Sequence, residues 1–483
     1  MDVVGLLKSL TPKRIGLILG PMLFLLLLCL EPFALGRDAN WVLAVAFWMV
    51  TWWVTEAVPL PVTALLPMLV FPLLGVRSLE AAAKPYGSPI VFLFFGGFML
   101  ALGLEEHLLH KRMALNIIRF SGFSPRRLVL GFMVSTAALS MWISNTATAL
   151  MMLPMAISVL NMLRAQQPSQ QVDRNFATAI VLSIAYGANI GGMGTLIGSP
   201  PNMAMAGILS NELKIEVTFV NWLVVALPIS VLLLIVAYGL LVLVLFPCQH
   251  VASEQAAQII ADERQKLGAM TGPQWRMAGV FLWVATLWVV QDAVKWIWPW
   301  LLLNDTSIAL FGVVLLFVIP ADIKAYRPLL DWSATTRLPW GILLLFGGGL
   351  SLADALRETQ VINAVGDAVA QLSPSQLWIT VFLLTGVALY LTELMSNVAL
   401  VNVFVPVLCG IALSLKVDPL ALALPATLAS SCAFMLPIST PPNAIVFSSG
   451  QVTIGQMVRA GFWLNLVCWV LIVVCCQIWF WTT

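Results

Sequence analysis

Charged residues are scarce in this chain of 483 residues. Asp, Glu, Lys and Arg together make up 10% of it, whereas soluble domains average about 25%. Hydrophobic residues account for 60%, and the mean hydropathy is +0.97. Apolar runs of about 17–25 residues, the length that crosses a bilayer, recur along the sequence. A soluble protein is therefore excluded, and the sequence predicts an all-α polytopic membrane protein with about eleven transmembrane helices.

The chain also lacks the motifs of enzymes. It has three histidines, none inside an apolar run, and no GxSxG, HExxH or GKS/GKT element, which argues against hydrolase, zinc-protease and nucleotide chemistry. Its seven cysteines show no CxxC spacing, so we expect small core side chains rather than disulfides or metal ligands. The sequence predicts no enzyme and no cofactor. An ion channel is disfavoured because no repeated filter sequence and no ring of like charges is present.

Basic residues are scattered over the connections and form no dense patch, so no nucleic-acid partner is expected. Placing the N-terminus in the cytoplasm puts most Lys and Arg residues on the cytoplasmic side, as the positive-inside rule requires, and leaves the C-terminus outside. The first apolar run ends at Glu31 and Pro32, where a signal peptide would have small cleavage-site residues. We therefore expect a retained N-terminal helix and a location in the cell inner membrane.

Two polar stretches interrupt the apolar sequence with the same pattern. They are MWISNTATALMMLPMA at 141–156 and YLTELMSNVALVNVFVP at 390–406. Aligning Ser144 with Ser396 also aligns Asn145 with Asn397. Two further pairs follow in the same order, FFGG with LFGG and GSPPN with STPPN. Three matches with similar spacing predict two homologous halves.

Each polar stretch is predicted to be the tip of a re-entrant hairpin. Residues 128–163 carry no charge, have basic residues on both sides, and are about one and a half spans long. With a hairpin there the two copies run in opposite directions, the signature of secondary transporters with a site at the repeat interface. The predicted parts are an N-terminal helix at 1–36, a first inverted repeat at 37–247 with its hairpin at about 125–163, a cytoplasmic linker at 248–276, and a second inverted repeat at 277–483 with its hairpin at about 375–415. The linker is expected to form a surface helix that ends at Gly272 and Pro273.

Oxygen atoms gather at these breaks. A monovalent cation such as sodium prefers oxygen ligands. The residues that offer them are Ser140, Ser144 and Asn145 in one half and Thr392, Ser396 and Asn397 in the other. The glycine- and proline-rich GGMGTLIGSPPN and CAFMLPISTPPN interrupt further helices and free backbone carbonyls. The alternative is purely structural: the hydroxyls bond back to their own helices and the asparagines cap the hairpins.

Basic side chains are absent from 128–163, 175–211, 368–415 and 419–458. An anion bound there would need amides, hydroxyls, helix ends and bound cations, which is a physical reason for coupling anion transport to sodium. Two acids stand in the apolar sequence. Glu56 is expected at a helix junction, and Glu393 is expected to brace its hairpin by accepting backbone N–H bonds, with a proton relay as the alternative.

Taken together, WWVTEAVPLPVTALLP, the SNT and SNV tips, GSPPN and TPPN resemble the divalent anion/sodium symporter (DASS) family over nearly the whole chain. The resemblance implies scaffold and elevator-type transport domains, a homodimer in the lipid bilayer, and symport of sodium with a C4-dicarboxylate (succinate, malate, fumarate) or citrate. It implies substrate contacts at Asn145, Thr146, Asn397, Val398, Thr440 and Pro441. It implies sodium ligands at Ser140, Ser144, Asn145, Gly194, Thr392, Ser396, Asn397 and Ser439.

One residue departs from the family pattern. Val398 stands where many relatives have threonine, so a hydroxyl that could bond a carboxylate is missing, and the choice between dicarboxylate and citrate stays open. The family also contains sodium-independent exchangers that swap one carboxylate for another. Sodium symport is the main prediction, and exchange is its alternative.

Overall fold

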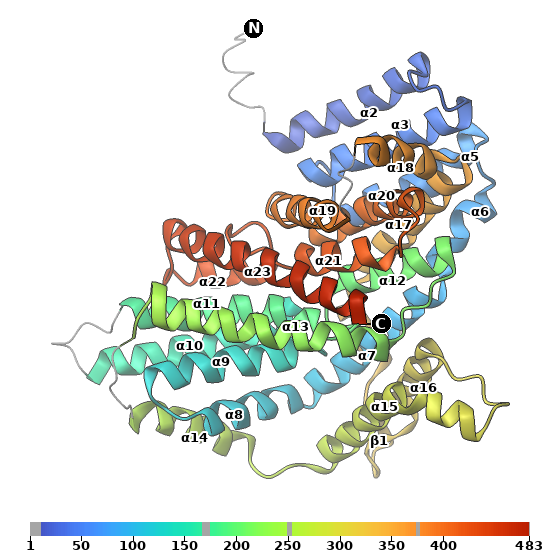
Figure 1. The fold of residues 1–483 in the computed structure, drawn as a ribbon. Helices are drawn as coiled ribbons and strands as arrows, with labels where there is room; N and C mark the ends of the chain where they lie inside the picture. The colour runs from blue at the N-terminus through green and yellow to red at the C-terminus, as the bar shows by residue number, and fades with distance from the viewer. Residues whose placement is uncertain (1–10, 167–173, 249–253, 373–376, 483) are drawn as a thin grey trace, which may run out of the picture.

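The computed structural model describes residues 11–166, 174–248, 254–372 and 377–482, which form a helical bundle with one small β-hairpin (Figure 1). The first residues of the predicted N-terminal segment, part of the predicted linker and the first residues of the second predicted hairpin lie outside these ranges.

The N-terminal elements are α2 (Pro12–Leu30), α3 (Arg37–Thr55), α4 (Leu60–Thr63), α5 (Leu66–Leu74), α6 (Leu79–Ala83) and the short helix η1 (Lys84–Gly87). A first series follows with α7 (Pro89–Glu106), α8 (Leu109–Ser121), α9 (Pro125–Ser140), α10 (Asn145–Gln166), α11 (Arg174–Met193), α12 (Pro200–Leu213), α13 (Phe219–Gly239) and η2 (Leu240–Leu245).

The middle of the chain contains α14 (Glu254–Leu267), α15 (Gly272–Ile297), α16 (Asp305–Val318), the antiparallel pair β1 (Pro320–Asp322) and β2 (Arg327–Pro328), and η3 (Trp332–Arg337). A second series then contains α17 (Trp340–Glu358), α18 (Val361–Leu372), α19 (Leu377–Leu391), α20 (Asn397–Leu415), α21 (Leu420–Ser430), α22 (Pro441–Ser448) and α23 (Ile454–Thr482).

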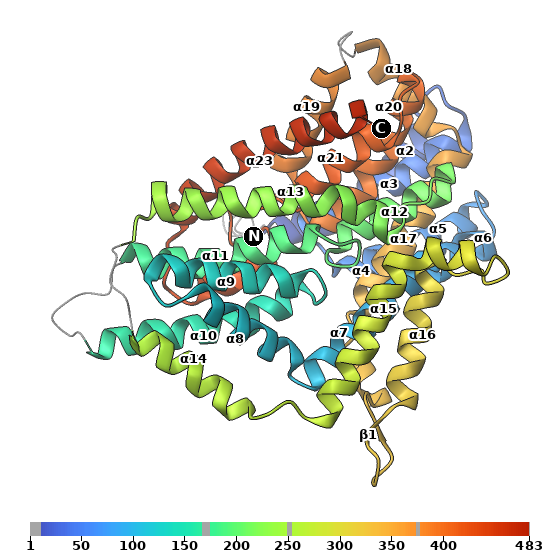
Figure 2. The same ribbon diagram turned by 60° about the horizontal axis from the view of Figure 1, so that its bottom comes forward.

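The two series have the same order of elements. In each, a long helix is followed by a shorter one, then by two helices separated at the SN motif, two separated at the PPN motif, and a final long helix. Their contacts are reciprocal, because α10 of the first series packs on α22 of the second, and α20 of the second packs on α12 of the first. Figure 2 shows the helices of both series lying together on one side of α15 and α16.

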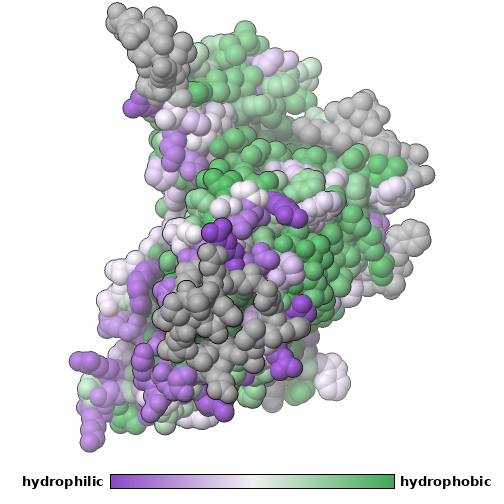
Figure 3. Space-filling model, turned by 90° about the vertical axis from the view of Figure 1, so that its left-hand side faces the viewer, coloured by the Kyte–Doolittle hydropathy of each residue, from purple (hydrophilic) through white to green (hydrophobic). Residues whose placement is uncertain are grey.

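The composition of the helices confirms a polytopic membrane protein. Eight helices of the described residues are long and apolar enough to cross a membrane, and five shorter apolar helices accompany them. Large apolar side chains that face outward, such as Ile18 (60% exposed) and Leu25 (57% exposed) on α2, have lipid as their natural partner. On the end of the bundle drawn in Figure 3, hydrophilic side chains form a broad patch beside continuous hydrophobic surface.

The end of the linker helix differs from the expectation. Helix α14 ends at Leu267, and Gly272 and Pro273 are instead the first residues of α15. The side chain of Thr271 accepts a hydrogen bond from the backbone N–H of Gln274, whose own side chain bonds back to Thr271. This capping box, with proline at the start of the helix, is a helix-initiation signal. The prediction that Gly272 and Pro273 end the linker helix is therefore wrong, because they begin α15.

Candidate functional site

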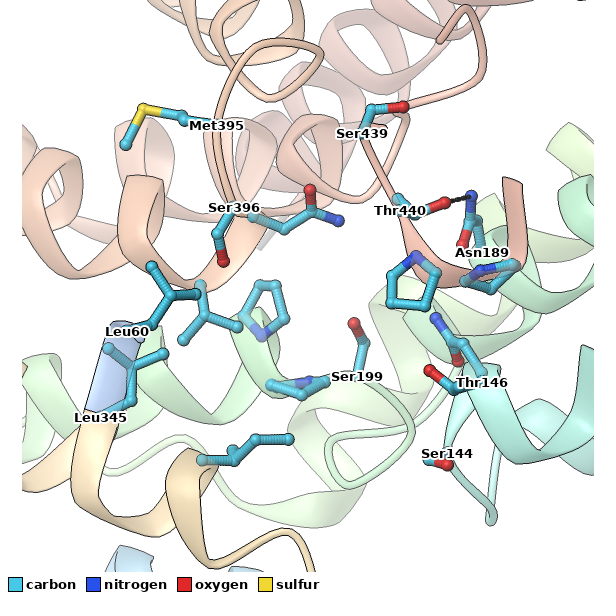
Figure 4. A pocket seen from close by; sticks show the side chains of 18 of the residues that line it. Leu60, Ser144, Thr146, Asn189, Ser199, Leu345, Met395, Ser396, Ser439 and Thr440 are labelled. Carbon is cyan, nitrogen blue, oxygen red and sulfur yellow. Dashed lines mark hydrogen bonds between the residues drawn. The ribbon is translucent and has the colours of Figure 1, made fainter. Parts of the chain in front are cut away.

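The four breaks of the two series meet at one cavity of about 800 Å³. Most of the predicted site residues line it: Ser144, Asn145, Thr146, Ser396, Asn397, Val398, Ser439, Thr440 and Pro441. Figure 4 shows Met395 and Ser396 on one side, Ser144 and Thr146 on the other, and Ser199 and Thr440 between them. The two SN tips, about 250 residues apart in the chain, are thus brought to the same cavity.

Helix ends give this cavity its electrostatic character. Helices α10 and α20 begin at Asn145 and Asn397, so the N–H groups of their first turns have no partner within the helix and carry partial positive charge at the tips. Helices α12 and α22 also begin here, but each starts with two prolines, which fix the break and donate no hydrogen bond. The tips of α10 and α20 are therefore the natural places for an anion.

Carbonyl and side-chain oxygens converge at the first tip. The Ser140 hydroxyl donates to Oδ1 of Asn145, which holds the amide over Gly192. A Cβ added at Gly198 would lie 2.7 Å from the carbonyl oxygen of Gly192 and 3.0 Å from both the Ser140 carbonyl and the Thr195 hydroxyl. These oxygens lie behind the tip, near the C-terminal ends of α9 and α11, and the Gly192 carbonyl also accepts a hydrogen bond from Asn202. Several neutral oxygens around a small space are a donor set suited to sodium.

The second tip has a similar arrangement. The Thr392 hydroxyl lies 2.7 Å from Oδ1 of Asn397 and 2.6 Å from the Ser430 carbonyl oxygen, and it shares its one proton between these two acceptors. Ser430 is the last residue of α21, so this hydroxyl joins the tip to the carbonyl end of the broken helix. The bonds of Ser140 and Thr392 therefore connect tip side chains, and the structural alternative of bonds to their own helices does not hold for them. It does hold for Ser144, whose Oγ accepts the backbone N–H of Ala147 as a cap.

Two asparagines that sequence reasoning missed hold the unwound segments in shape. The amide of Asn202 donates to the carbonyls of Gly192 (3.0 Å) and Thr195 (2.8 Å). At the equivalent place, Asn443 donates to Ala433 (2.8 Å) and Leu436 (3.0 Å). Both side chains are fully buried. The signal was available in the sequence, because each is the asparagine of a PPN motif.

Glu393 braces the second break in a way that the first break does not share. Its Oε1 accepts the backbone N–H groups of Phe434 and Met435, both at 2.8 Å, and its Oε2 accepts that of Leu436 at 3.2 Å. A further donor, Nδ2 of Asn465, lies 2.8 Å from Oε1. The expectation that Glu393 accepts backbone N–H bonds is confirmed, but these bonds belong to the unwound segment after α21 and not to its own hairpin. The aligned position in the first half is Met141, which has no carboxylate.

The first series also supports the second break directly. Asn189 on α11 donates to the Thr440 hydroxyl at 3.2 Å, a bond drawn in Figure 4, and to the Ala433 carbonyl at 3.4 Å. The hydroxyl of Tyr186, one turn earlier on α11, donates to the Phe434 carbonyl. The unwound segment after α21 is thus held by side chains from both halves.

Three predicted residues do not line the cavity itself. Ser140 and Thr392 lie behind the tips, bonded to Asn145 and Asn397, and are fully buried. Gly194 lies in the loop after α11, where an added Cβ would meet one carbonyl, that of Gly191, and two apolar side chains. Gly198, and not Gly194, is the glycine that faces the oxygen cluster. Val398 borders the cavity with an apolar side chain that is 9% exposed.

The cavity is lined by two charged side chains among the described residues, and neither is at a tip. They are Lys13 at the start of α2 and Glu56 at the end of α3. Their terminal atoms lie 3.6 Å apart. Glu56 occupies the junction that the sequence predicted, with a left-handed backbone (φ 47°) at the end of the helix.

Comparison with known proteins identifies the family. The family described as the sodium:sulfate symporter transmembrane region matches residues 13–483. The chain belongs to this family. Its similar relatives include sodium-dependent dicarboxylate transporters SdcS of Staphylococcus saprophyticus and Staphylococcus aureus, each 38% identical over 467 residues, which are 95% of this chain and 90% of the relative. This confirms the resemblance to divalent anion/sodium symporters and the expectation of a transporter rather than an enzyme.

Solved structures with the same fold are more distant. The YdaH transporter of Alcanivorax borkumensis matches with a TM-score of 0.51 at 13% identity, over 85% of this chain and 88% of that one. MtrF of Neisseria gonorrhoeae matches with a TM-score of 0.56 at 11% identity, over 96% and 94%. At these identities the likeness concerns the fold alone.

Proposed function

We propose that this symporter-family protein carries a C4-dicarboxylate (succinate, malate or fumarate) or citrate across the cell inner membrane together with sodium ions. The observation that carries the proposal is the shared cavity at which two helix N-termini meet, each with an oxygen cluster behind it and no basic side chain at its tip. The similar relatives are named sodium-dependent dicarboxylate transporters, which supports this substrate class.

Helix N-termini and the oxygen clusters behind them bind different ions. The amides of Asn145 and Asn397, with the first-turn N–H groups of α10 and α20, hold one carboxylate group each. Sodium ions occupy the oxygen clusters behind the tips, around Ser140 and Gly198 in one half and Thr392 in the other. Each bound cation offsets the desolvation of the neighbouring carboxylate, so binding of the two becomes cooperative.

Transport follows from the arrangement of the two series. We propose that α9 and α10 form a hairpin entering from the cytoplasm and that α19 and α20 form one entering from outside. The helices that carry the breaks form a transport domain that moves past a scaffold containing α15 and α16, and the protein works as a homodimer with a cytoplasmic N-terminus.

A reconstituted transport assay tests this function. Purified protein in liposomes should take up labelled succinate or citrate when sodium is high outside, and uptake should stop when choline replaces sodium. Uptake that ignores the sodium gradient but rises with carboxylate trapped inside would replace symport by exchange. Absence of carboxylate transport in both arrangements would overturn the proposal.

Paired amide variants test the site. Asn145→Ala and Asn397→Ala should each eliminate substrate binding, because each removes the amide of one tip and its bond to Ser140 or Thr392. Asn363→Ala is the matched control, since Asn363 is exposed, lies outside the cavity lining and donates to Gln360 three residues earlier. Normal affinity in either tip variant would remove the paired-tip arrangement.

Substrate choice is assigned to Val398. A hydroxyl bonded to a charged group contributes about 1.5–3 kcal/mol, so Val398→Thr should raise the affinity for one carboxylate substrate relative to another by about tenfold or more. Competition of succinate and citrate for labelled substrate measures the ratio. An unchanged ratio would show that this wall of the cavity does not select the substrate.

A further inference from the structure

The cavity also carries a charged pair from the N-terminal part of the chain. Residues 11–13, at the start of α2, and 54–56, at the end of α3, line the same cavity as the SN tips. The side chains of Lys13 and Glu56 are 65% and 60% exposed, so both remain in contact with water. Lys13 is therefore the one cationic side chain among the described residues that line the cavity.

Close helix packing holds Lys13 in this position. Gly16 and Gly20 are spaced four residues apart on α2, the small-xxx-small pattern that lets membrane helices approach closely. A Cβ at Gly16 would overlap Thr55, and one at Gly20 would lie within 2.8 Å of Trp48 and Trp52. Lys13 lies one turn before Gly16 on the same face, so the contact that seats α2 on α3 also places Lys13 beside Glu56.

We propose that Lys13 attracts the carboxylate substrate into the cavity and that Glu56 holds and moderates this charge. The inference rests on the proposed function, because it assigns a residue to the entry of the proposed anion. Lys13 does not replace a binding-site arginine, since it lines the cavity from the N-terminal helices, while the tips hold the anion with sodium ions and without a basic side chain.

The physical basis is the focusing of a field in a cavity with apolar walls. Low-dielectric walls focus the potential of a single charge, and such steering raises association rates and falls steeply with ionic strength. A dianion feels twice the interaction of a monoanion with the same lysine. Glu56 reduces this potential, so that a carboxylate is not retained beside Lys13. Removing the charge of Lys13 and removing that of Glu56 should therefore change the rate of substrate association in opposite directions.

The test measures sodium-driven uptake of labelled succinate by full-length protein in liposomes, at constant sodium and with ionic strength varied by choline chloride. At low ionic strength, Lys13→Ala should lower kcat/KM about fivefold with kcat unchanged, and the loss should shrink to less than about twofold at 0.5 M salt. Lys13→Arg should restore the wild-type value, and Glu56→Gln should raise kcat/KM. Lys84→Ala, which removes an exposed lysine outside the cavity, is the matched control.

Each outcome has a distinct meaning. A loss in Lys13→Ala that is equal at all ionic strengths, or that lowers kcat and is not restored by arginine, would assign Lys13 to packing and overturn the inference. An unchanged kcat/KM would overturn it as well while leaving the proposed function intact. If the unmodified protein transports no carboxylate, the proposed function fails, and the inference fails with it.

Discussion

Replacing Glu393 by glutamine tests how the second break is held. The carboxylate accepts three backbone N–H groups of the unwound segment and one side-chain amide, at 2.8 to 3.2 Å. Glutamine keeps one oxygen, which still accepts from Phe434 and Met435, but its NH₂ group then faces the N–H of Leu436, so two donors oppose each other. The variant loses at least one bond to a charged group, about 1.5–3 kcal/mol.

This loss should appear in binding because the unwound segment forms part of the cavity wall. If the segment must be in its braced shape to bind, the apparent affinity falls in proportion to the braced fraction. Since about 1.4 kcal/mol corresponds to a factor of ten, Glu393→Gln should weaken sodium-dependent substrate binding about tenfold to hundredfold. The protein should remain folded, because the rest of the bundle is unaffected. Equilibrium binding of labelled succinate at several sodium concentrations measures the change.

The pH dependence separates bracing from a proton relay. In the bracing mechanism the affinity of Glu393→Gln is reduced at every pH, whereas loss of a proton relay abolishes pH-driven transport and leaves sodium-dependent binding normal. Asn465→Leu is the matched variant, because it removes one donor to the carboxylate and leaves the three backbone bonds, so a smaller loss is expected. Wild-type affinity in Glu393→Gln would refute the bracing argument.

Two further predictions concern the first tip and the linker. Gly198→Ala should weaken sodium binding about tenfold or more, because the added Cβ enters the oxygen cluster. The control is Gly279→Ala, whose added Cβ meets nothing within 4 Å and should leave sodium binding unchanged. Equal sodium affinities of the two variants would contradict sodium binding at this oxygen cluster. Hydrogen bonds from Lys111 and Lys266 lower the pKa of Glu263. The ion pair between Lys111 on α8 and Glu263 on α14 is therefore fully formed above the ordinary glutamate pKa of about 4.3 and is lost as the pH falls through the lowered pKa. Lys111→Ala should raise hydrogen exchange in α14 already at neutral pH, and Lys266→Ala, whose bond lies within the helix, should not; similar exchange in both would show that Lys111 does not dock the linker.

Local chemistry was sufficient to predict the breaks. A proline pair removes two backbone N–H donors and interrupts a helix, and an uncharged polar cluster inside an apolar run marks a break. These positions are visible in the sequence as GSPPN, STPPN and the two SN tips. The helices end and begin at these motifs, with α12 starting at Pro200 and α22 at Pro441. The same reasoning failed at Gly272 and Pro273, since the same residue types serve both ends of a helix and only the capping partner distinguishes them.

The partners of buried groups could not be predicted in the same way. An isolated charge in the membrane is costly, so the sequence predicted that Glu393 accepts backbone N–H groups. It did not predict which segment donates them, because this depends on how α21 and α22 lie against the tip. Asn189 likewise gives no sequence signal, because its partner Thr440 belongs to the other half of the chain.

The sequence by itself determined that the chain lies in a membrane, that its two halves share a pattern, and where uncharged polar groups interrupt its helices, because these follow from composition and local backbone chemistry. Only the tertiary structure decided that the tips share one cavity and that Lys13 lines it. Those contacts join residues far apart in the chain, and their distances depend on how whole helices pack, which no local pattern encodes.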